Sequence, residues 1–398
     1  MLTIQFESNF CLYSTDMGKI LFISNCDPFG IGGGSFATHA YVKAFSEALG
    51  GESYIFLPEE GCSAIDNTVL SKEYIRIKRR SFFQKVWGML TGDAQRYTDS
   101  AIRIVRKMSG EFTYAVCNGS MSSGVLVDFF HSNNIKVITI HHNYEYEYFK
   151  SNPTVSHLKS LFLHHISTLE RNAYIKSDYN IFLTNDDKLT FEKCYGISSG
   201  INSTLGVFEF KDIPPLPVID NICKDNRLTF VITGQLFHEQ SIDSVSYFLD
   251  ELYQCLPKDC RVIIAGRNPA AILIEKCKCL QNVTLIPNPE NMQDILMQGD
   301  VYICPTRLGG GLKLRIMDGL RLGLPVITHN CSARGYDMFF GCDYFKTFSN
   351  SMEFSKAVCS IVSLYRHGRI NKSIIYEEYI KSFSYNDGLS RIMKLLKL

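Results

Sequence analysis

The sequence predicts an α/β protein built from two doubly wound domains. The chain has 398 residues, more than the roughly 250–300 at which single hydrophobic cores stop growing. Short apolar runs alternate along it with longer helical patterns, which is typical of parallel sheets covered by helices. A segment with three prolines and little periodicity, residues 209–226, interrupts this alternation and is expected to be a linker.

The first half begins with residues 20–24, a continuous apolar run of the kind that a buried parallel strand shows. A glycine loop, residues 30–35, and a helical pattern over residues 36–49 follow it. The same order recurs more loosely, with strands expected at residues 54–57, 114–117, 136–140 and 179–183. These elements predict an N-terminal domain over residues 17–208, preceded by an extension, residues 1–16.

The alternation restarts after the linker and predicts a C-terminal domain over residues 227–375. A last helical region, residues 376–398, is expected to pack back across the domain join. Ligands of such sheets bind at the carboxyl ends of the strands, so two facing domains place the site in the cleft between them. Strands are expected at residues 228–234, 261–266, 282–286, 301–305 and 325–329, and helices at residues 244–256, 292–297 and 312–322.

Composition and charge narrow the class of protein. Hydrophobic residues make up 45% of the chain and aromatic residues 12%, which is enough to fill two cores. The net charge of +1 lacks the basic excess of a nucleic-acid-binding protein. The 14 cysteines are dispersed and form no C-x-x-C pair, which is typical of reduced thiols. No apolar run is long enough to span a membrane, and the N-terminus lacks a signal-peptide pattern, so we expect a cytoplasmic protein.

A second glycine loop follows the strand expected at residues 301–305. Gly309, Gly310 and Gly311 allow the backbone to approach a ligand closely. The free N–H groups of a helix that starts near Leu312 and Lys313 would then form an anion site, to which Lys313 adds a formal charge.

Asp318 lies further along the same predicted helix, where a carboxylate suits a neutral diol, such as the hydroxyls of a ribose, better than a phosphate. A phosphate site with a hydroxyl-binding acid nearby describes a nucleotide. The alternative is that Asp318 is a surface residue paired at helical spacing with Arg315 or Arg321.

Residues 301–329, read with the A-G-R at residues 265–267, resemble the donor-binding signature of retaining nucleotide-sugar glycosyltransferases of the GT-B fold. The resemblance is to the large fourth family, some of whose members carry P-x-R-x-G-G-G-x-[KR]-x-K before E-A-M-A-x-G-x-P-V-V. It covers most of residues 17–340, including the segments at 141–148, 170–188 and 231–237. It implies two Rossmann-like doubly wound domains that face each other across a cleft.

The resemblance also implies a donor site. Asp318 stands where the family usually has a glutamate that binds the donor ribose, and the glycine loop with Lys313 would hold the diphosphate. Arg267 or Arg307 would reach the diphosphate from neighbouring loops. The N-terminal glycine loop would lie over the sugar and phosphate. The implied donor-binding residues are Gly33, Gly34, Gly234, Arg267, Arg307, Gly309, Gly310, Gly311, Leu312, Lys313 and Asp318.

Two departures from the family pattern concern the charges of this site. An acid that many members carry is replaced by Gly310, and the basic pair often found after the strand at residues 228–234 is absent from the following Q-L-F-H-E-Q. Neutralisation of the diphosphate would then depend on Lys313, Arg267 and the helix dipole. No metal site is implied.

Two adjacent histidines are the candidate catalytic residues. His141 and His142 follow the strand at residues 136–140, where the family has a histidine near the sugar. His142 is favoured because H-N-Y-E resembles the family's H-N-x-E variant, and Glu145 then becomes a weak candidate for contact with the acceptor. The alternative for at least one histidine is a polar loop residue. Retaining transfer on this fold needs no protein nucleophile, so the protein would position the substrates and stabilise the leaving diphosphate.

Residues 74–90, YIRIKRRSFFQKVWGML, carry five basic residues interleaved with aromatics and contain the only tryptophan. Such a stretch suits an anionic membrane surface or a polyprenyl-diphosphate acceptor. The alternative, which we favour from the pattern alone, is an ordinary amphipathic helix with its aromatic side chains in the core.

The sequence therefore predicts a retaining, metal-independent hexosyltransferase without a cofactor. Its donor would be a UDP- or GDP-sugar and its acceptor a glycan or polyprenyl-linked glycan of bacterial surface polysaccharide synthesis, with peripheral contact at the inner face of the membrane. Two alternatives are a nucleotide-sugar epimerase of the same fold and a non-catalytic pseudoenzyme that binds a glycan or nucleotide. An NAD-dependent oxidoreductase is disfavoured, because Ser35 occupies the third glycine position of G-x-G-x-x-G.

Overall fold

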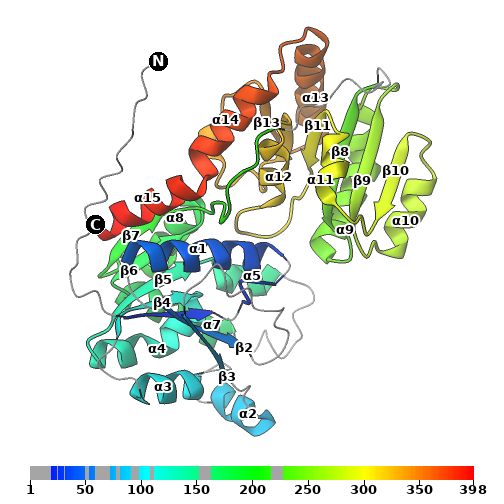
Figure 1. Cartoon of the computed structure of the whole chain (residues 1–398). Coiled ribbons are helices and arrows are strands. Elements are labelled where there is room, and N and C mark those ends of the chain that lie inside the picture. The colour runs from blue at the N-terminus through cyan, green and yellow to red at the C-terminus, as the bar shows by residue number, and fades with distance from the viewer. Residues whose placement is uncertain are drawn as a thin grey trace, which may run out of the picture.

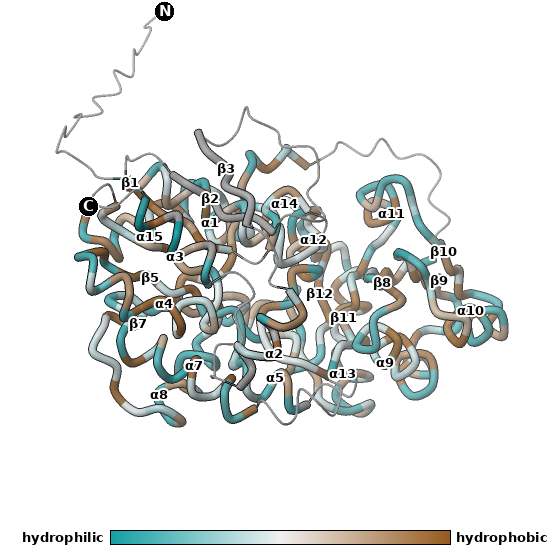
Figure 2. The backbone as a smooth tube through the Cα atoms, turned by 90° about the horizontal axis from the view of Figure 1, so that it is seen from below, coloured by the Kyte–Doolittle hydropathy of each residue, from teal (hydrophilic) through white to brown (hydrophobic). Residues whose placement is uncertain are grey.

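Each half of the chain forms one parallel β-sheet in the computed structural model, and the two halves lie side by side (Figures 1 and 2). The N-terminal sheet has the strand order β3-β2-β1-β4-β5-β6-β7 and the C-terminal sheet the order β10-β9-β8-β11-β12-β13. The prediction of two doubly wound α/β domains is confirmed. The structure describes residues 19–24, 26–30, 32–49, 53–58, 72–77, 81–90, 98–107, 112–151, 163–216 and 227–398.

Several predicted segments fall partly or wholly outside the described residues. These are the extension at residues 1–16, residues 217–226 of the linker, and parts of the basic aromatic segment at residues 74–90. None of the helices in the described part of the chain combines the length and apolar character that a membrane span requires.

In the N-terminal sheet the carboxyl ends of the strands face the cleft, and the strand order changes direction at β1. This strand is buried from Ile20 to Ser24 and pairs in parallel with β2 on one side and β4 on the other, so the crevice lies between β1 and β4. The elements are β1 (Lys19–Ser24), α1 (Gly33–Leu49), β2 (Ser53–Pro58), β3 (Lys72–Ile77), α2 (Phe82–Leu90), α3 (Thr98–Lys107), β4 (Phe112–Asn118), α4 (Ser120–Ser132), β5 (Lys136–His141), α5 (Glu145–Ser151), α7 (Leu163–Lys176), β6 (Tyr179–Phe182), α8 (Asn185–Tyr195) and β7 (Ile201–Thr204).

The C-terminal sheet repeats this design with its change of direction at β8, which pairs with β9 and β11. Its central strands β8, β9, β11 and β12 are mainly apolar and buried, as parallel strands covered on both faces must be, whereas the edge strands β10 and β13 are only partly buried. The elements are β8 (Thr229–Gln235), α9 (Glu239–Tyr247), β9 (Arg261–Arg267), α10 (Ala271–Lys278), β10 (Val283–Pro287), α11 (Met292–Met297), β11 (Val301–Cys304), α12 (Arg315–Arg321), β12 (Val326–His329), β13 (Phe345–Phe348), α13 (Ser351–Arg366), α14 (Lys372–Phe383) and α15 (Tyr385–Leu396).

The helix predicted at residues 312–322 begins later than expected. Helix α12 starts at Arg315 because Gly309 and Gly311 adopt positive φ angles of 82° and 68° and extend the loop. The first turn is closed by short-range bonds, in which the N–H of Ile316 donates to Lys313 O at 3.0 Å. The N–H groups at the start of this helix are therefore not those of Leu312.

The end of the chain packs on the other domain. Helix α15 lies along α1, as Figure 1 shows, and the hydroxyl of Tyr385 donates to Glu47 Oε2 at 2.6 Å. Gly388 faces the ring of Phe208, and a Cβ on Gly388 would come within 2.1 Å of that ring. The two sheets are thus joined both through the chain near residue 208 and through α15.

Candidate functional site

A cavity of about 420 Å³ lies between the two domains. The N-terminal domain contributes the start of α1, the ends of β4 and β5, and the start of α5, and the C-terminal domain contributes the loop before α12. Half of the predicted site residues line this cavity; they are Gly33, Gly34, His142, Glu145, Gly310, Gly311 and Leu312. The carboxyl ends of both sheets thus share one cavity of the size of a small-molecule site.

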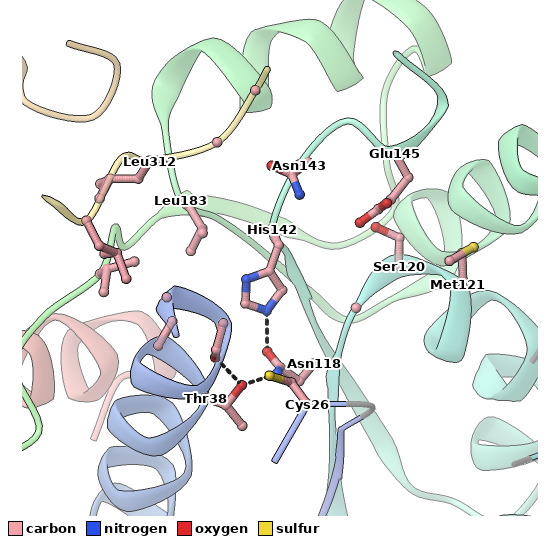
Figure 3. Close-up of a pocket in the computed structure, with 18 of the residues that line it drawn as sticks. Cys26, Thr38, Asn118, Ser120, Met121, His142, Asn143, Glu145, Leu183 and Leu312 are labelled. Atoms are coloured by element: carbon pink, nitrogen blue, oxygen red, sulfur yellow. Dashed lines mark hydrogen bonds between the residues drawn. The ribbon is translucent and has the colours of Figure 1, made fainter. Parts of the chain in front are cut away.

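His142 borders the cavity, and a chain of hydrogen bonds at the end of β4 holds its ring in place (Figure 3). Its Nε2 lies 2.5 Å from Oδ1 of Asn118, and the amide of Asn118 donates to Ser24 Oγ at 3.0 Å and to Thr38 Oγ1 at 2.8 Å. The two hydroxyl protons are already donated to the backbone carbonyls of residues 26 and 34. Both hydroxyls must therefore accept from Asn118, and this fixes the orientation of its amide.

The orientation of Asn118 fixes the tautomer of His142. Because Oδ1 of Asn118 can only accept, Nε2 of His142 carries the proton and Nδ1 is left as an acceptor. Burial lowers the pKa of His142 to about 4. The imidazole is therefore neutral at physiological pH and borders the cavity.

His141, at the end of β5, does not line the cavity. It is fully buried, with Nδ1 2.8 Å from Ser120 Oγ and Nε2 2.9 Å from Asn180 Oδ1. The ring stacks on Phe182, with the ring centres 4.8 Å apart. Burial also lowers the pKa of His141 to about 4. Both ring nitrogens are engaged inside the domain, so His142 is the better placed of the two for a ligand.

Glu145 starts α5 and borders the cavity, and a second carboxyl lies behind it. The backbone N–H of Glu145 donates to Glu170 Oε1 at 2.7 Å, and the hydroxyl of Tyr195 donates to Glu170 Oε2 at 2.9 Å. Burial raises the pKa of Glu145 to about 7 and that of the fully buried Glu170 to about 8. Glu145 can thus exchange a proton near neutral pH.

Two cations stand beside the second glycine loop. Lys313 donates from Nζ to Gly310 O at 3.0 Å, while the guanidinium of Arg315 lies 3.5 Å from both Thr233 O and Ser241 Oγ. Burial and the neighbouring Arg315 lower the pKa of Lys313 to about 8. Neither side chain forms an ion pair with a carboxylate in the described part of the chain. Two adjacent cations that are not directly paired with a carboxylate make a site that favours an anion.

The two predicted arginines lie differently. Arg307 pairs with both oxygens of Asp243, at 3.1 and 2.9 Å, and its guanidinium lies over the ring of Tyr247. Arg267 is exposed at the end of β9. Gly234 ends the apolar part of β8 directly beneath Arg315, whose Nη1 would lie 3.0 Å from a Cβ at that position. Among these arginines, Arg315 is the one held next to the glycine loop without an acidic partner.

Asp318 is half-buried on α12 and is held by Arg321, as one of the alternatives from the sequence proposed. Arg321 Nη2 donates to Asp318 Oδ1 at 2.6 Å, and its Nη1 contacts Glu209 Oε1 at 3.0 Å. Burial raises the pKa of Asp318. Within the described residues a hydrogen bond reaches only Oδ1 of this carboxylate, and Asp318 is not among the residues that line the cavity.

Sequence reasoning missed Arg315 and Asn118 as site residues. Arg315 occupies the last basic position of the P-x-R-x-G-G-G-x-[KR]-x-K pattern, so the motif itself could have identified it. Asn118 is a polar residue directly after the apolar run Y-A-V-C, at the carboxyl end of a strand, which is the usual place for a site residue in such a sheet.

Comparisons with known proteins agree with this architecture. Residues 227–362 match the family model described as glycosyl transferases group 1. Among curated proteins, no sequence matches this chain significantly.

Solved structures resemble the whole chain. Sucrose-phosphate synthase from Thermosynechococcus elongatus aligns with a TM-score of 0.71 and 12% identity, over 96% of this chain and 98% of its own. HepE from Anabaena, solved with UDP-glucose, aligns with a TM-score of 0.64 and 11% identity, over 96% and 99%. WaaG, a glycosyltransferase involved in lipopolysaccharide biosynthesis, aligns with a TM-score of 0.63 and 12% identity, over 94% and 99%. The chain is therefore a two-domain protein of the GT-B fold, and its residues 227–362 match the glycosyl transferases group 1 family.

Proposed function

We propose that this protein is a retaining glycosyltransferase that moves a hexose-type sugar from a UDP- or GDP-sugar to a glycan or lipid-linked glycan. The observation that carries the proposal is the pair of cations without acidic partners, Lys313 and Arg315, beside a glycine loop that faces His142 across the cavity. The structures of HepE with UDP and UDP-glucose make a UDP-sugar the first donor to test, and the role of WaaG in lipopolysaccharide biosynthesis favours a bacterial surface polysaccharide.

In this proposal the diphosphate of the donor lies against the glycine loop. The guanidinium of Arg315 and the ammonium of Lys313 neutralise it and stabilise the charge that develops when the sugar–phosphate bond breaks. Positive φ angles at Gly309 and Gly311 turn the loop without a Cβ between its backbone and the ligand. Oδ2 of Asp318 accepts from a ribose hydroxyl. No metal or cofactor is required for these roles.

The N-terminal domain positions the sugar and the acceptor. Neutral His142 offers Nδ1 as an acceptor to a sugar hydroxyl. It adds no positive charge that would attract the diphosphate away from Lys313 and Arg315. Glu145, with its pKa raised to about 7, accepts from or donates to an acceptor hydroxyl. The acceptor hydroxyl attacks the sugar carbon from the face that the leaving diphosphate occupies. As the sugar–phosphate bond breaks, the hydroxyl proton passes to an oxygen of the departing diphosphate, so the protein supplies geometry and charge rather than a nucleophile.

The test is a thermal-shift panel with UDP, GDP, ADP, CMP and NAD on the unmodified protein and on Arg315→Gln. A ligand present at about 100 times its Kd adds about 2.7 kcal/mol of apparent stability. One nucleoside diphosphate should shift the melting temperature, and Arg315→Gln should weaken its binding about tenfold or more, because a charge-assisted contact contributes roughly 1.5–3 kcal/mol. Arg307→Gln is the matched control, since Arg307 already pairs with Asp243, and should retain the shift.

Other results would replace the proposal. A shift with NAD alone would assign the cavity to a dinucleotide. Isomerised donor in NMR spectra without any acceptor would identify an epimerase, and nucleotide binding without turnover across a panel of glycan acceptors would favour the pseudoenzyme.

A further inference from the structure

Helix α2 presents its apolar face to solvent. The side chains of Phe82, Phe83 and Trp87 are 73%, 83% and 70% exposed, and Val86 is 39% exposed, whereas Gly88 is buried. At about 100° per residue, these four side chains lie within an arc of about 140° on one face of the helix. The interpretation favoured from the sequence, an amphipathic helix with its aromatic side chains in the core, is therefore wrong. We call this face, Phe82, Phe83, Val86 and Trp87, the α2 patch.

The α2 patch is unusual for this chain. Five phenylalanine or tryptophan side chains are exposed among the described residues, and three of them are in this nine-residue helix. Single exposed apolar side chains are normal on a soluble protein, but a contiguous aromatic patch marks an interaction surface. In Figure 1 the helix lies at the lower edge of the N-terminal domain.

The charge around the patch identifies the partner. Residues 74–90 contain five basic residues and no acidic one, although the whole chain has a net charge of only +1. Helix α3, at the same end of the domain in Figure 1, adds the exposed Arg103, Arg106 and Lys107 against one acid, Asp99. Exposed aromatic side chains flanked in the sequence by basic residues match the interface of an anionic bilayer, where rings enter the headgroup layer and cations meet lipid phosphates.

We propose that α2 docks the N-terminal domain onto an anionic phospholipid surface, with Phe82, Phe83 and Trp87 inserted among the headgroups. The contact is peripheral. The proposal rests on the α2 patch and the basic residues near it in the sequence, and it does not depend on the proposed transferase activity.

Trp87 makes the test direct, because it is the only tryptophan of the chain and lies in the patch. Its fluorescence is recorded with vesicles of phosphatidylcholine alone and with vesicles that also contain phosphatidylglycerol, and bound protein is measured by flotation. Phosphatidylglycerol vesicles should shift the emission to the blue and carry the protein upward, and added salt should weaken both effects. Pure phosphatidylcholine should give little of either.

The variant Phe82→Ser/Phe83→Ser should lose about tenfold in partitioning to phosphatidylglycerol vesicles, because two rings no longer enter the interface. Both side chains are exposed, so folding should be unaffected, as circular dichroism can check. Phe340→Ser, an exposed aromatic in the C-terminal domain at 51%, is the matched control and should bind as the unmodified protein does. Unchanged emission and no flotation with phosphatidylglycerol would overturn the proposal. So would a blue shift that appears with protein concentration in the absence of lipid, which would assign the patch to self-association.

Discussion

At the residue scale, the neutral state of His142 depends on Asn118. The amide of Asn118 accepts from Nε2 of His142 and adds no charge, so burial keeps the pKa of the imidazole at about 4. Asn118→Asp places a carboxylate at the same position, which should raise the pKa of His142 into the range of about 6 or above. Histidine NMR titrations should then show a new group that titrates between pH 5 and 8, and turnover should fall as the pH is lowered through that range.

Asn180→Asp provides a comparison within the same domain, because Asn180 bonds to Nε2 of His141 in the same way. It should raise the pKa of His141, which does not line the cavity. A His142 resonance that stays neutral down to about pH 5 in a folded Asn118→Asp protein would contradict the role assigned to Asn118.

Residue roles could be predicted only where they depend on neighbours in sequence. The motif located the glycines of the second loop that line the cavity, because a glycine loop is a local feature. It could not rank the arginines, since the availability of Arg307 is decided by Asp243, a residue 64 positions earlier in the chain. Nor could it show that Asn180 and Ser120 engage both nitrogens of His141. Such pairings exist only once the strands are aligned.

At the element scale, the apolar runs predicted ten strands and the two-domain order, but they missed β3, β7 and β13 and did not show which way each helix faces. The sequence shows that residues 82–90 have an apolar face. The same pattern fits a face that packs on the core and a face that is exposed to solvent. The start of α12 was misplaced for a related reason, because the positive φ of Gly311 is a backbone state that glycine permits but does not dictate.

Glu170 gives the element-scale prediction, since it holds the start of α5 from inside the domain. Its pKa is raised from an ordinary value of 4.5 to about 8, so the folded protein keeps a proton that the unfolded chain releases. Stability from this group is present below pH 4.5 and is lost as the pH rises to about 8. In the Glu170→Gln variant the side chain is neutral at every pH, so this loss of stability with rising pH does not occur. Relative to the unmodified protein, the variant should therefore gain about 2 kcal/mol or more between pH 5 and pH 8.5.

Urea unfolding at the two pH values measures this gain, and the difference between proteins at each pH removes the contributions of titrating groups that do not interact with Glu170. An equal difference at both pH values would mean that Glu170 is ionised in the folded protein throughout this range. In that case the hydrogen bonds from Glu145 and Tyr195 would outweigh burial.

At the scale of the whole molecule, the cavity exists only while the two domains face each other. Besides the chain near residue 208 and α15, an ion pair spans the cleft, with Arg334 of the C-terminal domain 3.3 Å from Asp186 at the start of α8. Both side chains are substantially exposed, 40% for Arg334 and 60% for Asp186, so the pair contributes less than about 1 kcal/mol to the closed arrangement. Asp186→Lys or Arg334→Glu alone should therefore weaken nucleotide binding by roughly two- to fivefold, because the ligand must also close the cleft.

The double variant Asp186→Lys/Arg334→Glu distinguishes an effect on domain closure from a local effect of either substitution on the site. It restores an attractive pair across the cleft, so nucleotide affinity in calorimetry should return close to that of the unmodified protein. High salt should remove the difference among all four proteins, since exposed charges are screened within about a Debye length. X-ray scattering without ligand should show a larger radius of gyration for the single variants only. If the double variant binds as weakly as the singles, or if the weakening persists in high salt, Asp186 and Arg334 act on the site through their own surroundings rather than through the angle between the domains.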